Sequence, residues 1–265
     1  MLTQTLRSTP PALPLASALF LGAAYFAVRL PDAPGARIGS YACTFLIALP
    51  SFVALFGYLG AKRATLALIS LSAFGYVVET IGVATGLPYG LFYYGDSLGP
   101  KAFGLVPYLL PVSYVPLVLG AVAAARPAPP RPAVWILASA LLLVAVDAVL
   151  DPGAASLGFW IWPEGGAYYG VPLSNFLGWM LSSVLAAALL LAVARPGEEP
   201  PPPGLLDGAV LAVAFWTGVA VFSGLALPAL LGAALLAHFL RRRARLSESR
   251  RSRRRGYKLQ GERTG

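Results

Sequence analysis

Long apolar runs separated by short polar segments organise most of the chain. Runs of about 20 apolar residues are long enough to cross the hydrocarbon layer, and they lie at 12–30, 38–60, 64–86, 104–125, 133–151 and 173–194. The stretch 205–240 is too long for one ordinary crossing and contains Gly224 and Pro228 near its middle, so it predicts two short helices, 205–222 and 225–240. The pattern predicts an all-α, polytopic membrane helical bundle with about eight transmembrane helices, or seven if 205–240 crosses once.

Composition supports a membrane setting and a single folded domain. Apolar residues make up 57% of the chain and charged residues 12%, which a water-soluble surface does not normally tolerate. The proline-rich connectors 126–132 and 195–204 are too short to fold separately. We therefore expect one integral membrane domain over 1–240, followed by a basic, disordered tail over 241–265.

Basic residues are distributed unevenly between the two ends of the predicted helices. With eight crossings, one side carries the chain termini, Arg7, Lys62, Arg63, Arg126, Arg131, Arg195 and the basic tail. The opposite side carries only Arg29, Arg37 and Lys101. Because short cytoplasmic loops are enriched in Lys and Arg, a multi-pass protein of the cell membrane with both termini in the cytoplasm is predicted.

The tail accounts for the net charge of +9. It holds eleven of the twenty basic residues and only two acids, Glu248 and Glu262. Such a segment could bind nucleic acid, but contact with anionic lipid headgroups at the membrane surface is the simpler interpretation. Anionic lipids are therefore the expected partner of the tail, and nucleic acid is not.

The residues that usually bind metals or cofactors are scarce. The single cysteine, Cys43, lies inside an apolar run, and the single histidine, His238, lies at the end of the last helix beside arginines. No His or Cys cluster is present, nor a phosphate-binding glycine loop with its lysine, nor a Ser/His/Asp set. We expect no metal and no cofactor.

Three acids and one amide fall inside or at the ends of predicted crossings. A carboxylate there costs about 2.5–3.5 kcal/mol on insertion scales and usually faces the protein interior or a wet cavity. Asp147 and Asp151 are four residues apart and share a helix face, while Glu79 lies on a stripe of small and polar residues. With Asn175 on the next helix, these groups converge toward one side of the membrane and form a candidate site.

Two aromatic loops lie on the same side as these acids. Aromatic residues at a membrane boundary are often only an interfacial belt. Their coincidence with three acids and an amide instead favours a site that binds an apolar ligand. The candidate binding residues are Tyr93, Tyr94, Trp160, Trp162, Tyr168, Tyr169, Asn175 and Trp179.

Several of these residues belong to motifs that resemble a known family. The motifs are Glu79-Thr-Ile-Gly, Thr85-Gly-Leu-Pro-Tyr-Gly, Tyr93-Tyr94, Leu98-Gly-Pro, Val106-Pro107, Asp151-Pro152, Trp160-Ile-Trp162, Tyr168-Tyr-Gly-Val-Pro and Asn175-Phe-Leu-Gly-Trp179. Together they resemble the membrane carotenoid 1,2-hydratases of the CruF type, a family that includes the bisanhydrobacterioruberin hydratases. The similarity spans about 38–195. It implies a cofactor-independent hydro-lyase that adds water to the terminal 1,2 double bond of an acyclic carotenoid end, of the lycopene or gamma-carotene type.

The chemistry of hydration fits the candidate site. Adding water to a trisubstituted alkene begins with protonation by a carboxylic acid, and apolar surroundings favour the protonated form. Aromatic faces stabilise the resulting tertiary carbocation, at about 0.5–2 kcal/mol each. A water held by Asn175 or by a carboxylate acting as base then attacks the cation. Glu79, Asp147 and Asp151 are the predicted catalytic residues.

Three other functions use the same features. A membrane lycopene cyclase shares the protonation step but lets a neighbouring alkene quench the cation. A UbiA-like prenyltransferase would use Asp147-x-x-x-Asp151 as a magnesium motif, although a first aspartate-rich motif is missing. A non-catalytic lipid carrier would leave carotenoid unchanged. For the hydratase, the expected partners are a carotenoid within the bilayer and other enzymes of the same pathway.

Overall fold

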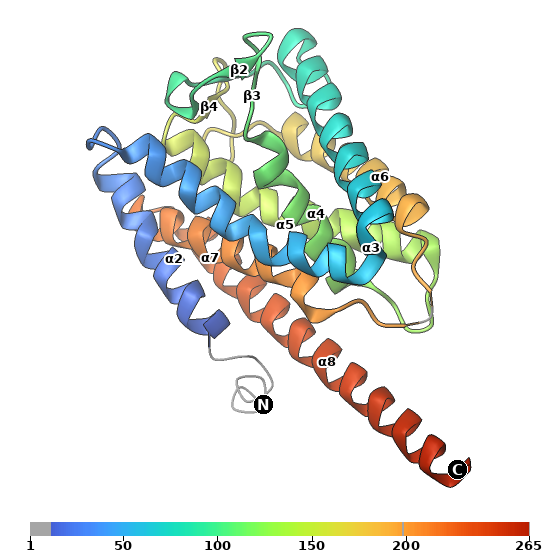
Figure 1. Cartoon of the computed structure of the whole chain (residues 1–265). Helices are drawn as coiled ribbons and strands as arrows, with labels where there is room; N and C mark the ends of the chain where they lie inside the picture. Colours follow the sequence, from blue (N-terminus) through green and yellow to red (C-terminus); the bar gives the residue numbers. More distant parts are fainter. Residues whose placement is uncertain (1–11, 198, 265) are drawn as a thin grey trace.

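The protein is a bundle of helices (Figure 1). A computed structural model describes residues 12–197 and 199–264, with side chains as far as Ser252. The α-helices in this part of the chain are α2 Ala12–Arg29, α3 Ala36–Thr85, α4 Leu110–Ala125, α5 Pro132–Ser156, α6 Leu173–Ala194, α7 Asp207–Phe222 and α8 Ala226–Thr264. Of the described segments, five are long and apolar enough to cross a membrane: α2, α3, α5, α6 and Pro203–Phe222, which joins the short helix η2 (Pro203–Leu206) to α7. The predicted all-α membrane bundle is confirmed.

Helix α3 contains the second and third predicted crossings in one element. It changes direction at Gly60, which has φ 72° and ψ 165° (Figure 1). This conformation is essentially restricted to glycine. The expected loop between the two crossings is therefore a bend at a single residue, and Lys62 and Arg63 follow directly after it.

Helices α4 and α7 form the centre of the bundle. Every residue of α4 from Tyr114 to Ala124 is buried, as is most of α7. Large apolar side chains are exposed instead on the outer helices, among them Leu19 of α2, Phe45 of α3 and Leu177 of α6. This arrangement is the one expected for a bundle whose outer surface meets lipid rather than water.

Short strands join two loops at one end of the bundle (Figure 1). Strand β1 (Tyr93–Tyr94), from the α3–α4 loop, pairs antiparallel with β4 (Trp160–Ile161), from the α5–α6 loop. Strands β2 (Lys101–Ala102) and β3 (Val106–Pro107) pair within the α3–α4 loop, which also contains the short helix η1 (Asp96–Leu98). Because this hairpin occupies residues that were predicted to be helical, the crossing predicted over 104–125 begins only at Leu110.

Helix α5 continues past its predicted end at Asp151 as far as Ser156. Pro152 has no N–H, so it cannot bond to the carbonyl of Ala148 one turn earlier. The hydroxyl of Tyr168 donates a hydrogen bond to that carbonyl at 3.1 Å. The α5–α6 loop thus supplies the missing donor, and Asp151 lies inside a helix rather than at its end.

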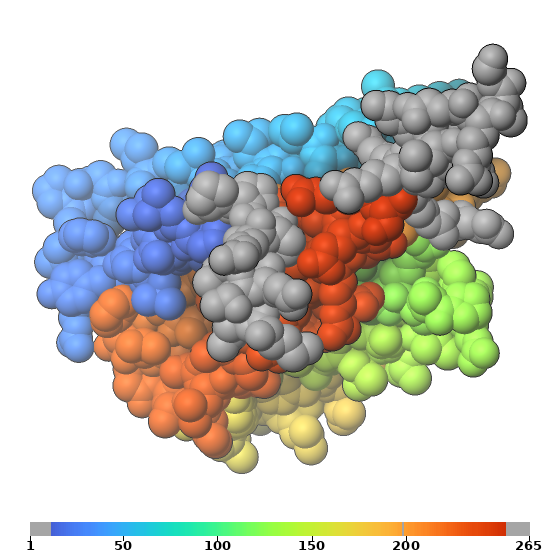
Figure 2. All heavy atoms as spheres, turned by 90° about the horizontal axis from the view of Figure 1, so that it is seen from below, coloured from blue at the N-terminus to red at the C-terminus, as the bar shows by residue number. Residues whose placement is uncertain are grey.

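The basic segment 241–265 continues α8 as far as Thr264, where a tail without regular structure was expected. No proline follows Pro228 in the chain, and arginine has a high helix propensity. The first arginines are bound to the bundle. Arg243 donates two hydrogen bonds to the carboxylate of Asp207, one of them at 3.0 Å, and Arg242 donates to the carbonyls of Ala124 and Arg126. In Figure 2, α8 (red) accordingly lies beside the α4–α5 connection (light green).

Candidate active site

Two carboxyl groups and one amide lie together between α5 and α6. Asp147 and Asp151 are one turn apart on α5, and Asn175 is in the first turn of α6; all three are at most 2% exposed. The Nδ2 of Asn175 donates to Oδ2 of Asp147 at 3.1 Å and also to Oδ2 of Asp151. One amide group therefore bridges both acids, as their shared helix face and the position of Asn175 predict.

The β1–β4 pair connects this cluster to Glu79 of α3. Trp160 of β4 donates from Nε1 to Oδ1 of Asp151 at 3.1 Å, and Tyr94 of β1 donates from its hydroxyl to Oε2 of Glu79 at 2.7 Å. Tyr94 and Trp160 lie opposite each other in the strand register, with ring centroids 6.0 Å apart in an edge-to-face arrangement. A continuous set of contacts thus runs from Glu79 through the two rings to Asp151, Asn175 and Asp147.

The partners of the three acids are neutral donors. The ion pairs of the described residues join Lys101 to Asp96, Arg243 to Asp207 and Arg250 to Glu199, and none of them includes Glu79, Asp147 or Asp151. In the described part of the chain, Oδ1 of Asp147 is buried without a hydrogen-bond partner. A buried oxygen with no protein partner is available to a bound water or to a substrate.

The other predicted aromatic residues surround this set without joining it. Trp162 is buried and packs against Phe92, with ring centroids 6.1 Å apart, and Trp179 packs against Tyr114 at 6.2 Å. Tyr168 binds α5 at the carbonyl of Ala148. Tyr93 and Tyr169 are 49% and 38% exposed and lie at the surface.

Two buried tyrosines beside the acids were not predicted. Tyr89 lies between Gly82 of α3 and Gly178 of α6, where an added Cβ would come within 2.7 Å and 2.6 Å of its ring. The stripe of small residues on α3 therefore accommodates a ring from the following loop. Tyr89 lies in Leu87-Pro88-Tyr89-Gly90, so an aromatic residue between Pro and Gly in a quoted motif was the available signal.

Tyr114 of α4 is the second missed residue. Its ring packs against Gly75 of α3, and it is close enough to Glu79 to interact with it electrostatically. Its buried hydroxyl has no hydrogen-bond partner in the described part of the chain. Nothing in the spacing of the apolar residues of α4 distinguishes this tyrosine from an ordinary core residue.

The fold and the site define a polytopic membrane protein with a buried carboxyl cluster beneath an aromatic cap, and comparisons with known proteins agree with this class. Residues 39–239 match the family described as carotenoid biosynthesis protein. A bisanhydrobacterioruberin hydratase from Haloarcula japonica is 40% identical over 207 residues, which are 73% of this chain and 69% of that protein. No solved structure matches. The chain belongs to the carotenoid biosynthesis protein family, which confirms the resemblance seen in the sequence.

Proposed function

We propose that this protein is a carotenoid hydratase that adds water across the terminal 1,2 double bond of an acyclic carotenoid end group. Its family and the name of the Haloarcula relative support a hydratase acting on a carotenoid. The observation that carries the proposal is the set of contacts that joins Glu79, Asp151 and Asp147 under the rings of Tyr94 and Trp160. This arrangement offers proton donors, a proton acceptor and aromatic faces at one place.

In the proposed reaction, a carboxylic acid donates its proton to the less substituted alkene carbon. The neighbouring tertiary carbon becomes a cation, and the faces of Tyr94 and Trp160 stabilise it through their quadrupoles. The oxygen of a water molecule bonds to that carbon and loses a proton to a carboxylate. The net change is the addition of one water, with no oxidation or reduction, so the reaction needs neither metal nor organic cofactor.

The hydrogen bonds favour different roles for the two aspartates. Asp151 accepts bonds from Asn175 and Trp160, and two donors favour a carboxylate. Asp147 keeps Oδ1 without a protein partner, and this oxygen can carry a transferable proton. We assign Asp147 as the acid, Asp151 as the base, and Glu79 as the third member of the acid–base set.

The membrane setting of the proposal follows from the charge pattern. The carotenoid reaches the site from within the bilayer of the cell membrane, both termini are cytoplasmic, and the basic segment of α8 contacts anionic lipids. Other enzymes of carotenoid synthesis act on the same membrane-held pigment, so association with them is part of the proposal.

Expression in cells that accumulate lycopene, followed by mass analysis of the pigments, tests the function. A gain of one water supports hydration. Unchanged mass with altered absorbance would instead indicate a cyclase, and unchanged pigment would indicate a carrier. The Asp147→Asn variant, expressed to the same level in the same membranes, is the matched control, since it retains the shape of the site without the transferable proton.

A further inference from the structure

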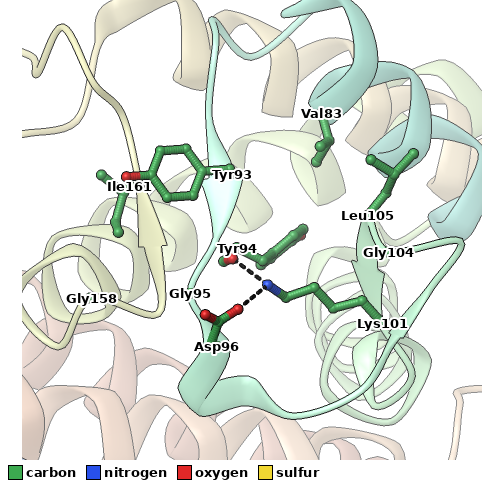
Figure 3. A pocket seen from close by; sticks show the side chains of 10 residues that line it. All are labelled: Val83, Tyr93, Tyr94, Gly95, Asp96, Lys101, Gly104, Leu105, Gly158 and Ile161. Atoms are coloured by element: carbon green, nitrogen blue, oxygen red, sulfur yellow. Dashed lines mark hydrogen bonds and ion pairs between the residues drawn. The ribbon is translucent and has the colours of Figure 1, made fainter.

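A pocket of about 550 Å³ lies between the α3–α4 and α5–α6 loops, beside the paired strands that carry Tyr94 and Trp160 (Figure 3). The α3–α4 loop supplies most of its wall, and Val83 of α3 with Gly158 and Ile161 of the α5–α6 loop supply the rest. The two loops that line it lie at the end of the bundle away from the C-terminal end of α8 (Figure 1). None of the three acids lines the pocket, but Tyr94 does, and its hydroxyl donates to Glu79.

One side of the pocket carries a charged pair. The Nζ of Lys101 donates to Oδ1 of Asp96 at 3.0 Å and to the carbonyl of Tyr94 at 2.6 Å (Figure 3). The Asp96 carboxylate is fully exposed, while the Lys101 side chain is 15% exposed. Ions at the wall of an open pocket retain water around them. The chemistry of this wall therefore suits water better than the hydrocarbon end of a polyene.

Tyr94 links this pocket to the acids. It lines the pocket, its side chain is buried, and its hydroxyl donates to Glu79 at 2.7 Å. Burial, followed by the charge of the neighbouring Glu79, raises the pKa of Tyr94 well above its ordinary value. The hydroxyl thus keeps its proton and one lone pair that can accept a hydrogen bond from a water. Among the described residues that line the pocket, Tyr94 alone hydrogen-bonds to a member of the acid cluster.

We propose that this pocket is the aqueous vestibule that supplies water to the buried acids, with the Tyr94 hydroxyl connecting pocket water to Glu79. The proposal rests on the proposed hydratase function. Each turnover consumes one water, whereas the proton donated to the alkene is replaced by the proton that the attacking water loses. Water then approaches from the loop side and the carotenoid from the bilayer, so the two substrates do not compete for one path.

Blocking the pocket with a water-soluble thiol reagent tests the vestibule. The chain has one cysteine, so a Cys43→Ala background allows a single cysteine to be placed at Leu105, which lines the pocket, or at Ser97, which is exposed outside it. The probe is a sulfonatoethyl methanethiosulfonate, and mass analysis reports its attachment. Labelled Leu105→Cys should lose hydration on the order of tenfold or more, retain bound carotenoid and recover with a reducing agent. Labelled Ser97→Cys should keep its rate.

Three results would overturn the proposal: no labelling of Leu105→Cys by the aqueous probe, full labelling with an unchanged rate, or loss of bound carotenoid on labelling.

Tyr94→Phe provides a second measurement, because it keeps the ring beside Trp160 and removes only the hydroxyl. It should lower turnover about tenfold or more without lowering carotenoid retention. Tyr108→Phe, which removes the hydroxyl of an exposed tyrosine of the same loop outside both the pocket and the acids, should not. Equal rates for these two variants would also contradict the proposed connection from pocket water through the Tyr94 hydroxyl to Glu79. If the unlabelled parent does not hydrate carotenoid, the hydratase function fails instead.

Discussion

The indole N–H of Trp160 donates a hydrogen bond to Oδ1 of Asp151 at 3.1 Å. This bond joins a residue of the α5–α6 loop to an acid inside helix α5. Trp160 therefore has two separate properties at the site: an aromatic face and an N–H donor to a buried carboxyl group. Because the two properties depend on different atoms, substitutions can separate them.

Trp160→Phe removes the donor and keeps an aromatic face, whereas Trp160→Leu removes both. We expect Phe to cost much less turnover than Leu, since a cation over an aromatic face gains about 0.5–2 kcal/mol. Leu should lower turnover more than carotenoid retention, because the cation exists only along the reaction. Initial rates and bound pigment in membranes holding equal protein measure both. Tyr168→Phe, which loses only the bond to Ala148, is the mild control, and equal rates for Trp160→Phe and Trp160→Leu would contradict cation stabilisation.

Replacing Asn175 with Leu should destabilise the protein. The substitution removes the amide that donates to both Asp147 and Asp151, and a buried polar group left without its partner costs about 1–3 kcal/mol. The unfolding temperature in detergent, measured against the parent, reports this loss. Ser174→Ala alters the adjacent residue, whose hydroxyl makes only a 3.4 Å contact with the Tyr89 carbonyl, and should leave the temperature nearly unchanged. A parental unfolding temperature for Asn175→Leu would mean that the bridge contributes little.

Much of this architecture could be predicted because hydrophobic length and helix face are local properties of the sequence. The runs predict where each described α-helix lies, although not the continuation of α8 through the basic segment, and the four-residue spacing of Asp147 and Asp151 predicts that they share a face. The boundaries near the site could not be predicted in the same way. The continuation of α5 past Pro152 depends on Tyr168, which lies in the following loop and supplies the donor for Ala148.

Contacts between distant segments account for what the sequence did not reveal at the site. The spacing of Tyr94 and Trp160 along the chain carries no sign that β1 and β4 pair, yet that pairing connects Glu79 to Asp151. Tyr114 likewise becomes notable only when α3 brings Gly75 and Glu79 beside it. The catalytic roles assigned to Glu79, Asp147 and Asp151 remain predictions.

Activity should survive chelation. Proton transfer from a carboxylic acid and capture of a cation by water require no metal, so treatment with EDTA should leave the hydration rate unchanged. The measurement is pigment mass after incubation of membranes with and without the chelator. Loss of activity that magnesium restores would favour the prenyltransferase interpretation, in which Asp147 and Asp151 hold the ion.

Both chain termini should be cytoplasmic, with the loops near 87–103 and 152–172 on the opposite side. This orientation follows from the excess of Lys and Arg at the end of the bundle where the basic segment of α8 leaves it. A reporter that is active only in the cytoplasm should be active when it is fused after Arg255. The same reporter fused within the 87–103 loop is the internal comparison, and activity of the Arg255 fusion only outside the cytoplasm would reverse the orientation.

Amide replacement of the three acids tests the proposed site most directly. Glu79→Gln, Asp147→Asn and Asp151→Asn preserve size and much of the hydrogen bonding but remove the transferable proton or the base. The true acid and base should lose turnover by about 10²–10⁴, the range typical of general acid–base groups, while the protein still folds and retains carotenoid. Asp32→Asn is the matched control, because its side chain is exposed in the α2–α3 connection and lies outside both the acid cluster and the pocket. If all three cluster variants hydrate carotenoid at the parental rate in membranes holding equal amounts of protein, these acids serve only helix packing, and the chemistry lies elsewhere in the molecule.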